Sequence, residues 1–290
     1  MIVVTGASGQ LGRRIVEQLL KRAPDTRIGV SVRDPEKVAD LAARGVRVRR
    51  ADYSDAASLR TAFEGATQVL LISSNDRKAD PVAQHRTAVE VVKAAGAKRV
   101  VYTSQISSSP TSAFIPGITH GKTEAVLRES GLPFTALRNG FYATTALGFL
   151  ENAIKAGELI APEDGKFSWT GHDDLAEAAA TVLMNDGRFD GATPPLTGSE
   201  SLDFTDLAAL ASKLAGKDIK RITITDDEYV ARMVKAGTPE MFARFSLGMF
   251  VAARRGEFSE VNPALEQLVG HRPMTVATLA ASVMGSITES

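Results

Sequence analysis

Residues 2–12 read IVVTGASGQLG, a short apolar run followed at once by three glycines with the spacing G-x-x-G-x-x-G. The run predicts a buried strand, and the apolar residues that follow at helical spacing predict a helix directly after the glycines. In such a strand–turn–helix, Gly6 permits the tight turn, Gly9 lets the backbone approach a pyrophosphate, and Gly12 lets the helix pack on the strand. The first amide groups of the helix would hold phosphate oxygens. The stretch therefore predicts a dinucleotide-binding fold.

The first half of the chain alternates short apolar runs with helical patterns. Strands are expected over 2–5, 27–32, 46–50, 69–72, 100–103 and 134–138. The helices expected between them include one that begins at Asp34-Pro35, one that Ser54 caps and that ends at Phe63, and two more over 81–95 and 119–130. Continuous apolar strands that alternate with helices are typical of a parallel sheet covered on both faces. The expected class is α/β, with a Rossmann-type doubly wound parallel sheet.

After about residue 140 helical patterns dominate. Helices are expected over 144–156, 173–184, 204–215, 226–236 and 239–255, and strands only over 193–196 and 219–223. Thr225 and Glu228 have the spacing of a capping box, and Thr238-Pro239 that of an N-cap followed by proline. We therefore predict a dinucleotide-binding domain over 1–140 and a smaller, mostly helical substrate lobe over 141–290, some segments of which return to the sheet domain.

Composition excludes several classes of protein. The 290 residues include 34 basic and 34 acidic side chains and no Cys, so neither thiolate metal sites nor a Cys nucleophile is possible. The neutral total argues against nucleic acid as a partner. The first fifty residues nevertheless hold eleven basic and five acidic residues, a local positive field that suits a small polyanion. No signal peptide or membrane span is visible, so we predict a soluble, cytoplasmic protein.

The end of the second expected strand indicates which dinucleotide binds. Folds that bind NAD place an Asp or Glu about 20 residues past the glycines, on the ribose 2′-hydroxyl. Here residues 31–37 read SVRDPEK, and the residue at the strand end is Arg33, a planar donor suited to a 2′-phosphate. Asp34 and Glu36 are explained by the helix start. We predict NADPH rather than NADH as the cofactor.

Six segments together resemble the NmrA-like branch of the atypical short-chain dehydrogenases. They are TGASGQLG, SVRDPEKV, GV-V-ADYSD, VVYTSQ, HGKTEAVLRESGLPFTALRNGFY and HDDLAEAAATVL. Within that branch the chain is most similar to type-2 NAD(P)H:quinone oxidoreductases and triphenylmethane reductases, from Ile2 to about Met284.

The resemblance implies a set of site residues. Cofactor contacts are implied for Gly6, Ala7, Ser8, Gly9, Gln10, Leu11, Arg33, Asp52, Tyr53, Ser73, Ser74, Asn75, Thr103, Lys122, Asn139, Gly140 and Phe141. Lys122 matches the Lys of the superfamily's catalytic Tyr-x-x-x-Lys pair and would hold the nicotinamide ribose. Substrate contacts are implied for Ser104, His120, Asn139 and Tyr142.

The chain departs from the superfamily at one catalytic position. Four residues before Lys122, where the general-acid Tyr is expected, stands Ile118. A quinone or a cationic dye accepts hydride without a placed acid, because its reduced form is a stable phenolate or a neutral leuco dye. The leading hypothesis is therefore an NADPH-dependent reductase of a small aromatic acceptor. A protein that binds NADP(H) without turnover and regulates a partner, and a dye or ene reductase, stay open as alternatives.

Other patterns favour structural roles. Gly121-Lys122-Thr123 lacks the upstream glycine of the phosphate-binding loop (P-loop) of NTPases. His120 and Glu124 are interpreted as a helix surface pair rather than metal ligands, and no metal is expected. Trp169 is expected in the core, as are the helically spaced Phe245, Met249 and Phe250. The acids of His172-Asp173-Asp174 are interpreted as helix-start residues. A monomer or a homodimer is expected.

Overall fold

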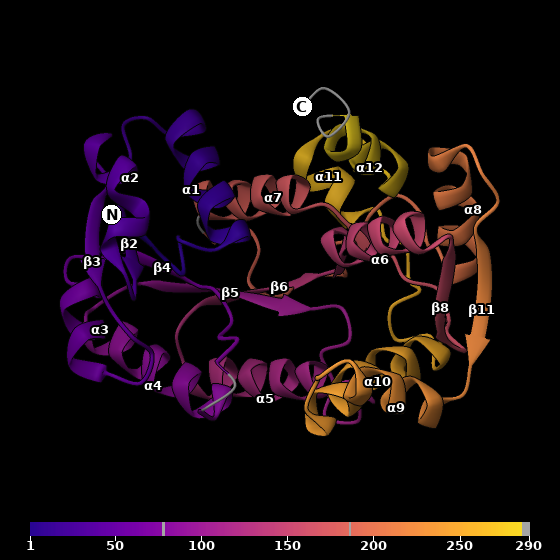
Figure 1. Cartoon of the computed structure of the whole chain (residues 1–290). Coiled ribbons are helices and arrows are strands. Elements are labelled where there is room, and N and C mark those ends of the chain that lie inside the picture. Colours follow the sequence, from indigo (N-terminus) through magenta and orange to yellow (C-terminus); the bar gives the residue numbers. More distant parts are fainter. Residues whose placement is uncertain (77–78, 186, 286–290) are drawn as a thin grey trace. The chain divides into compact units, whose positions relative to one another are not determined.

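The computed structural model describes residues 1–76, 79–185 and 187–285 (Figure 1). The chain divides into two compact units. Unit 1 comprises Met1–Gln105, Thr119–Arg138 and His172–Pro194, and unit 2 comprises Ile106–Ile118, Asn139–Gly171 and Pro195–Ser290.

The sheet that dominates unit 1 has the strand order β10-β6-β5-β4-β1-β2-β3. Its strands are β1 (Ile2–Thr5), β2 (Ile28–Val32), β3 (Arg47–Arg50), β4 (Gln68–Leu71), β5 (Arg99–Gln105), β6 (Phe134–Asn139) and β10 (Gly191–Ala192). The registers of β1 with β2 and β4, of β2 with β3, of β4 with β5 and of β6 with β10 are all parallel. This order confirms the expected Rossmann-type α/β class.

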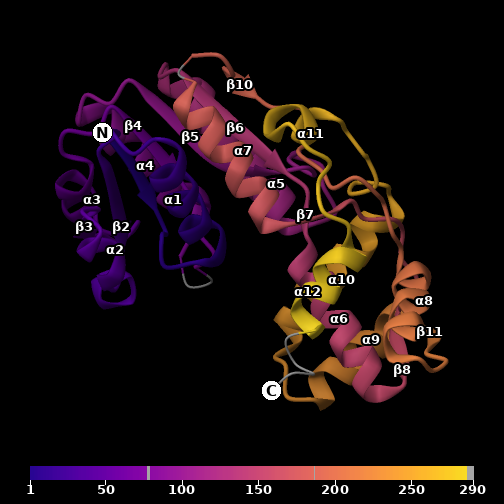
Figure 2. The ribbon, with the colours of Figure 1, turned by 90° about the horizontal axis from the view of Figure 1, so that it is seen from above.

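Helices cover both faces of this sheet (Figure 1). One face carries α1 (Gln10–Arg22), α2 (Ala39–Ala43) and α7 (His172–Met184), and the other carries α3 (Ala56–Phe63), α4 (Pro81–Ala94) and α5 (Ile115–Ser130). Helices α1 and α7 are far apart in sequence but pack side by side (Figure 2), joined by a 2.8 Å ion pair between Arg14 and Asp173. Strands β1, β2, β4 and β5 are almost wholly buried between the two helical layers, as their apolar sequence predicts.

Two helix starts in unit 1 differ from the sequence prediction. The N-cap of α3 is Asp55, not Ser54, because the Asp55 carboxylate accepts from the amides of Ala57 and Ser58 at 2.9 and 3.2 Å. The predicted cap of Asp34 is confirmed, although the turn it starts, Pro35–Val38, is a 3-10 helix.

Proline explains two further differences. Helix α5 begins at Ile115 rather than Thr119, since Pro116 lies in the first turn, where its missing amide costs no helical bond. The strand expected over 193–196 is wrong, and β10 ends at Ala192. Pro194 and Pro195 follow, and they have no N–H to continue the ladder.

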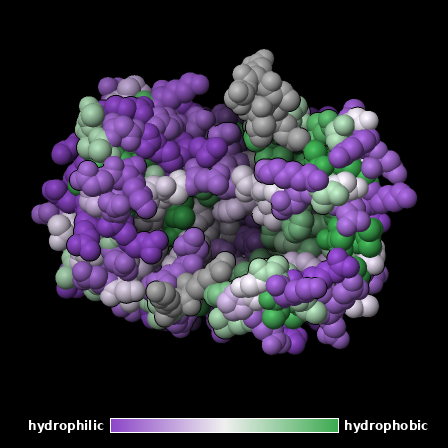
Figure 3. Space-filling model, viewed as in Figure 1, coloured by the Kyte–Doolittle hydropathy of each residue, from purple (hydrophilic) through white to green (hydrophobic). Residues whose placement is uncertain are grey.

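Unit 2 is mostly helical, as predicted. Its helices are α6 (Ala143–Ala156), α8 (Phe204–Ala215), α9 (Asp226–Lys235), α10 (Glu240–Arg254), α11 (Ala264–Val269) and α12 (Val276–Gly285). Two small parallel pairs accompany them: β8 (Glu158–Pro162) with β11 (Lys220–Ile224), and β7 (Phe141–Tyr142) with β9 (Trp169–Thr170). The strand β8 was not predicted. In Figure 3 apolar residues are more frequent over this unit than over the β1–β3 region.

Two helix N-caps in unit 2 differ from the sequence prediction. The complete capping box belongs to Asp203 and Asp206 of α8, whereas Thr225 only accepts from the Glu228 amide, and the Glu228 carboxylate pairs with Arg232. Helix α10 has Pro239 as its N-cap, because the Thr238 amide still bonds to α9.

Aromatic rings fill the core of unit 2. Trp169 is 1% exposed and stacks on Phe167 with ring centres 4.4 Å apart. Phe250 and Met249 are buried and Phe245 packs against the same cluster, so these residues belong to the core as expected.

Candidate functional site

The candidate site lies where the chain order of the sheet reverses. Strand β1 has β2 on one side and β4 on the other, so the helices that follow β1 and β4 leave toward opposite faces. Ligands of open α/β sheets bind at the carboxyl ends of the strands that flank such a switch point. The glycine loop follows β1 at this edge.

The glycine loop needs its glycines for backbone reasons. Gly6 has φ of +62°, a left-handed conformation, and its amide donates to the Ser31 carbonyl at 2.9 Å. A Cβ on Gly12 would lie 2.5 Å from the Gly6 carbonyl oxygen, so a side chain there would push the first turn of α1 off the loop. Ala7 and Leu11 are buried, whereas Ser8, Gly9 and Gln10 are exposed.

The first turn of α1 suits an anion. Its N-cap, Gly9, supplies no side-chain acceptor, and the turn holds no acidic residue. By contrast α3 and α4 begin with Asp55 and Asp80, whose carboxylates take the first amides. The first amides of α1 thus lack a side-chain acceptor at the positive end of the helix dipole, and the loop fits a pyrophosphate.

Arg33 is exposed and directly follows β2. Because β2 is the parallel neighbour of β1, Arg33 and the glycine loop follow adjacent strands at the same edge of the sheet. Nearby arginines are occupied: Arg13 pairs with Asp40 and Glu17, and Arg44 pairs with Glu17. Within the described ranges no hydrogen bond or ion pair of the Arg33 guanidinium is found. The group is therefore available to a ligand.

Tyr53 ties the ends of β1 and β4 together. Its hydroxyl donates to the Ile72 carbonyl at 2.7 Å and lies 2.6 Å from the Thr5 hydroxyl, which accepts from the Ile72 amide. Burial raises the pKa of Tyr53. The Asp52 carboxylate accepts from the Ser54 amide. Both residues lie after β3, where contacts with the cofactor stay a prediction.

A buried histidine supports the segment after β4. The His85 ring is fully buried in α4, its Nε2 accepts from the Ser74 amide at 2.9 Å, and its Nδ1 lies 2.9 Å from the Thr123 hydroxyl. Burial lowers the pKa of His85 to about 3, so the ring is neutral at physiological pH. The Ser73 amide donates to the Thr103 hydroxyl, which joins the ends of β4 and β5. Asn75 follows them and is exposed.

Ser104 is tied to a buried carboxylate that the sequence interpretation placed on the surface. Glu124 is 1% exposed, accepts from the Ser104 hydroxyl at 2.7 Å, and pairs with Arg138 through bonds of 3.0 and 2.7 Å. The interpretation of His120 and Glu124 as a surface pair is therefore wrong for Glu124. The buried face of α5 meets the ends of β5 and β6, which no helical spacing reveals.

Tyr102 and His120 form a second polar pair beside Ser104. The Tyr102 hydroxyl lies 2.8 Å from Nδ1 of His120 and 3.4 Å from the Ser73 hydroxyl. Burial lowers the pKa of His120 to about 4, against the opposing charge of Glu124. Lys122, two residues on, is exposed, and its role as a cofactor ligand stays a prediction.

The remaining predicted residues, Asn139–Tyr142, belong to unit 2. Asn139 is 2% exposed, and within the described residues its buried Oδ1 has no hydrogen-bond partner. Burial raises the pKa of Tyr142, and a hydrogen bond with Asn139 opposes the rise. A Cβ on Gly140 would lie 2.2 Å from the Thr170 hydroxyl, and the Phe141 ring packs in the aromatic core. Their predicted cofactor and substrate contacts are untested.

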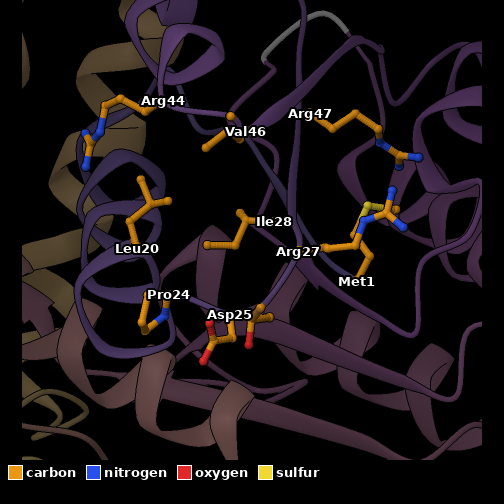
Figure 4. A pocket seen from close by; sticks show the side chains of 11 residues that line it. Met1, Leu20, Pro24, Asp25, Arg27, Ile28, Arg44, Val46 and Arg47 are labelled. Atoms are coloured by element: carbon orange, nitrogen blue, oxygen red, sulfur yellow. The ribbon is translucent and has the colours of Figure 1, made fainter.

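A hollow lies at the edge of the sheet opposite the glycine loop, before β1, β2 and β3 (Figure 4). Arg27 and Arg47 stand on one side of it beside Met1, and Arg44 on the other. Arg47 donates to the carbonyls of Ala62 and Glu64 at 2.6 and 2.7 Å and so caps α3. The hollow is thus separate from the glycine loop and holds none of the predicted site residues.

The described residues hold neither a metal cluster nor a membrane-spanning helix. Among them no group of three or more His, Asp or Glu side chains is placed to hold a metal ion. Nor does any of their helices have the length and apolar character needed to cross a membrane.

A family model described as NAD(P)H-binding matches residues 6–186, which include the glycine loop, Arg33 and the Ser104–Glu124–Arg138 cluster. The chain belongs to this family. Quinone oxidoreductase 2 of Escherichia coli is 36% identical over 278 residues, 96% of each chain. Its crystal structure with NADPH superposes with a TM-score of 0.92 at 34% identity over 98% of this chain and 100% of that one.

Triphenylmethane reductase of Citrobacter sp. is a second structural relative, with a TM-score of 0.89, 30% identity and coverage of 98% of this chain and 99% of that one. It too has been solved with NADP(H). The NmrA-like resemblance and the NAD(P)H cofactor are thereby confirmed, and the protein is an oxidoreductase of the quinone reductase type.

Proposed function

We propose that this oxidoreductase transfers hydride from NADPH to a quinone or a similar conjugated aromatic acceptor. NADPH supplies the hydride when bound. The loop from Gly6 to Leu11 would hold its pyrophosphate, and Arg33 its 2′-phosphate. The relatives that share this fold include a quinone oxidoreductase solved with NADPH and a triphenylmethane reductase solved with NADP(H).

The observation that carries the choice of acceptor is the state of two hydroxyl donors, a Tyr and a Ser, which the resemblance to short-chain dehydrogenases implies at position 118 and at the end of β5. Ile118 replaces the Tyr, and the Ser104 proton is directed at Glu124. Two bonds from Arg138 favour the ionised carboxylate, which can only accept, so Ser104 has no proton to give to a substrate. A carbonyl that becomes an alkoxide needs such a donor, whereas a quinone becomes a stable phenolate.

The protein's part is then chiefly to position two flat molecules and exclude water. We assign Tyr142 to the acceptor, as the family resemblance implies. Asn139 carries a buried acceptor oxygen that is unpaired within the described residues, which supports the cofactor contact that the resemblance implies, with the nicotinamide amide as the donor.

The test is acceptor-dependent oxidation of NADPH, followed at 340 nm with a benzoquinone and with a cationic triphenylmethane dye. We expect turnover with the quinone well above the rate without acceptor, and lower turnover with NADH. Tight NADPH binding without turnover of either acceptor would contradict the proposal.

That same outcome would favour a second candidate, a regulatory protein that senses NADP(H). The loss of Tyr at position 118 is compatible with it. A change in binding to a protein partner between the free and NADPH-bound forms would support this role. A triphenylmethane-dye or ene reductase is separated from a quinone reductase by the relative rates in the first assay. The cytoplasmic location, the absence of nucleic acid and the monomer or homodimer stay predictions.

A further inference from the structure

Tyr102 lies in β5 opposite Leu71, the last residue of the neighbouring strand β4, and His120 of α5 lies beside it. Tyr102 and Ser104 alternate along β5 and therefore point to the same face of the sheet, toward α5. The Tyr102 ring lies between two imidazoles, with ring centres 5.3 Å from His85 and 5.7 Å from His120. Its hydroxyl reaches Nδ1 of His120 at 2.8 Å.

The Tyr102 hydroxyl determines which nitrogen of His120 carries the proton. A phenol is a stronger donor than a neutral imidazole N–H, and an imidazole nitrogen is a stronger acceptor than a phenol oxygen. The 2.8 Å contact to Nδ1 is also much shorter than the 3.4 Å contact to the Ser73 hydroxyl. Tyr102 thus donates to Nδ1, and Nε2 carries the hydrogen.

Nε2 of His120 is free to meet a ligand. The side chain is partly exposed, and Nε2 is not among the buried polar atoms that lack a partner. It makes no hydrogen bond to the residues that the structure describes. His120 and Lys122 are roughly 200° apart around α5, so the two side chains leave the helix on different sides. His120, not Lys122, accompanies Ser104 and Tyr102.

We propose that His120, kept in one tautomer by Tyr102, donates a hydrogen bond from Nε2 to the carbonyl oxygen of the acceptor. This inference rests on the proposed quinone reductase function and names the group that stabilises its product. A neutral imidazole in this role polarises a carbonyl without having to lose its proton. Tyr102 acts through His120 and is a positioning residue.

The step balances without a further reactant. The quinone gains one hydride with its two electrons and becomes the hydroquinone monoanion, while NADPH is oxidised to NADP⁺. The anionic oxygen accepts the Nε2–H hydrogen bond, and water supplies the second proton after release. No proton leaves His120 or Tyr102.

The experiment compares His120→Phe, His120→Asn and Tyr102→Phe with the full-length wild-type chain. We expect His120→Phe to lower kcat with a benzoquinone by roughly 10- to 100-fold, because a donor to the developing oxyanion is lost. The Kd for NADPH should stay within about twofold. His120→Asn retains an N–H donor and should keep more of kcat than the Phe variant. Tyr102→Phe should lower kcat by less than His120→Phe, with little change in the benzoquinone KM.

A binding measurement makes the inference testable without turnover. The probe is 4-nitrophenolate, whose anionic oxygen mimics the reduced product, titrated into the NADP⁺ complex. Its affinity should fall by roughly tenfold in His120→Phe, as expected for a hydrogen bond to a charged group. Glu129→Gln, an exposed change on the same helix, is the matched control and should leave both readouts unaltered.

The outcomes separate the two proposals. A wild-type chain that reduces no quinone refutes the proposed function, and the nitrophenolate titration then still decides the role of His120. Unchanged kcat and nitrophenolate affinity in His120→Phe would overturn the inference. So would a loss of NADPH affinity as large as the loss of kcat, since it would show a structural role.

Discussion

At the residue scale, the role of a hydroxyl depends on the group to which it donates its hydrogen bond. The sequence places Ser104 at the end of β5, where the superfamily keeps a catalytic Ser. It does not show that the Ser104 hydroxyl donates to Glu124, 20 positions away, or that Arg138, 34 positions away, pairs with the same carboxylate. With its hydrogen used in this way, the hydroxyl can only accept from a further group. The position of Arg33 could be predicted, because it depends only on a strand end next to the glycine loop. The state of Ser104 could not, because it depends on how α5 packs on the sheet.

Arg33→Ser tests whether the Arg33 guanidinium contacts the 2′-phosphate of NADPH. Because the guanidinium has no partner within the described residues, its removal should leave the fold intact and cost only ligand contacts. We expect the Kd for NADPH to rise by roughly 10- to 100-fold, as expected for charge-assisted bonds to the 2′-phosphate. The Kd for NADH should change by less than about threefold. Both are measured by quenching of protein fluorescence.

Arg27→Ser is the control for this prediction. It removes the same charge at the other end of β2, in the hollow of Figure 4. Its effect on NADPH affinity should be small, because only the overall field changes. Equal losses of NADPH and NADH affinity in Arg33→Ser would show that Arg33 does not read the 2′-phosphate.

At the element scale, the strands and most helices could be predicted, because the buried side of a helix or strand requires apolar residues at a characteristic spacing in the sequence. Helix ends were predicted less well. The choice between Ser54 and Asp55 as a cap, or between Thr238 and Pro239, depends on single hydrogen bonds with neighbouring segments. Short strands such as β8 exist only through their partner β11, which is about 60 residues away.

Gly12→Ala is the element-scale prediction and tests whether α1 must approach the loop closely. The added Cβ would meet the Gly6 carbonyl oxygen at 2.5 Å and its carbon at 2.9 Å, both backbone atoms that cannot turn aside. We expect a loss of about 1–3 kcal/mol in the free energy of unfolding, measured by urea denaturation. NADPH affinity should fall by more than tenfold, because the first amides of α1 move.

Gly148→Ala in α6 is the matched change at a helical glycine with open space around its Cα. Alanine is the better helix former, so we expect a gain of about 0.5–1 kcal/mol with NADPH affinity unaltered. Wild-type NADPH affinity in Gly12→Ala would refute the assignment of this turn to the pyrophosphate.

At the scale of the whole molecule, the histidines whose pKa values are lowered by burial lie in unit 1. His85, His120 and His172 all lie there, and burial lowers their pKa values to about 3, 4 and 4. The fourth histidine, His271, lies exposed in unit 2. Between pH 6.5 and about 4 the unfolded chain therefore binds protons at these rings that the folded chain does not. Stability must fall as pH decreases through this window.

His85→Gln tests this linkage at its most buried member. For an unfolded pKa of 6.5 and a folded value of about 3, His85 alone should lower the free energy of unfolding by about 2 kcal/mol between pH 8 and pH 5. The measurement is a series of urea denaturation curves at half-unit pH steps. The variant should lose some stability at pH 8, where the bond to the Ser74 amide is weakened. The informative quantity is the slope below pH 6.5, which should be shallower than in wild type by up to one proton. Parallel slopes for the two proteins would show that the pKa of His85 is the same in the folded and the unfolded chain, which contradicts a ring that stays neutral below pH 6.5.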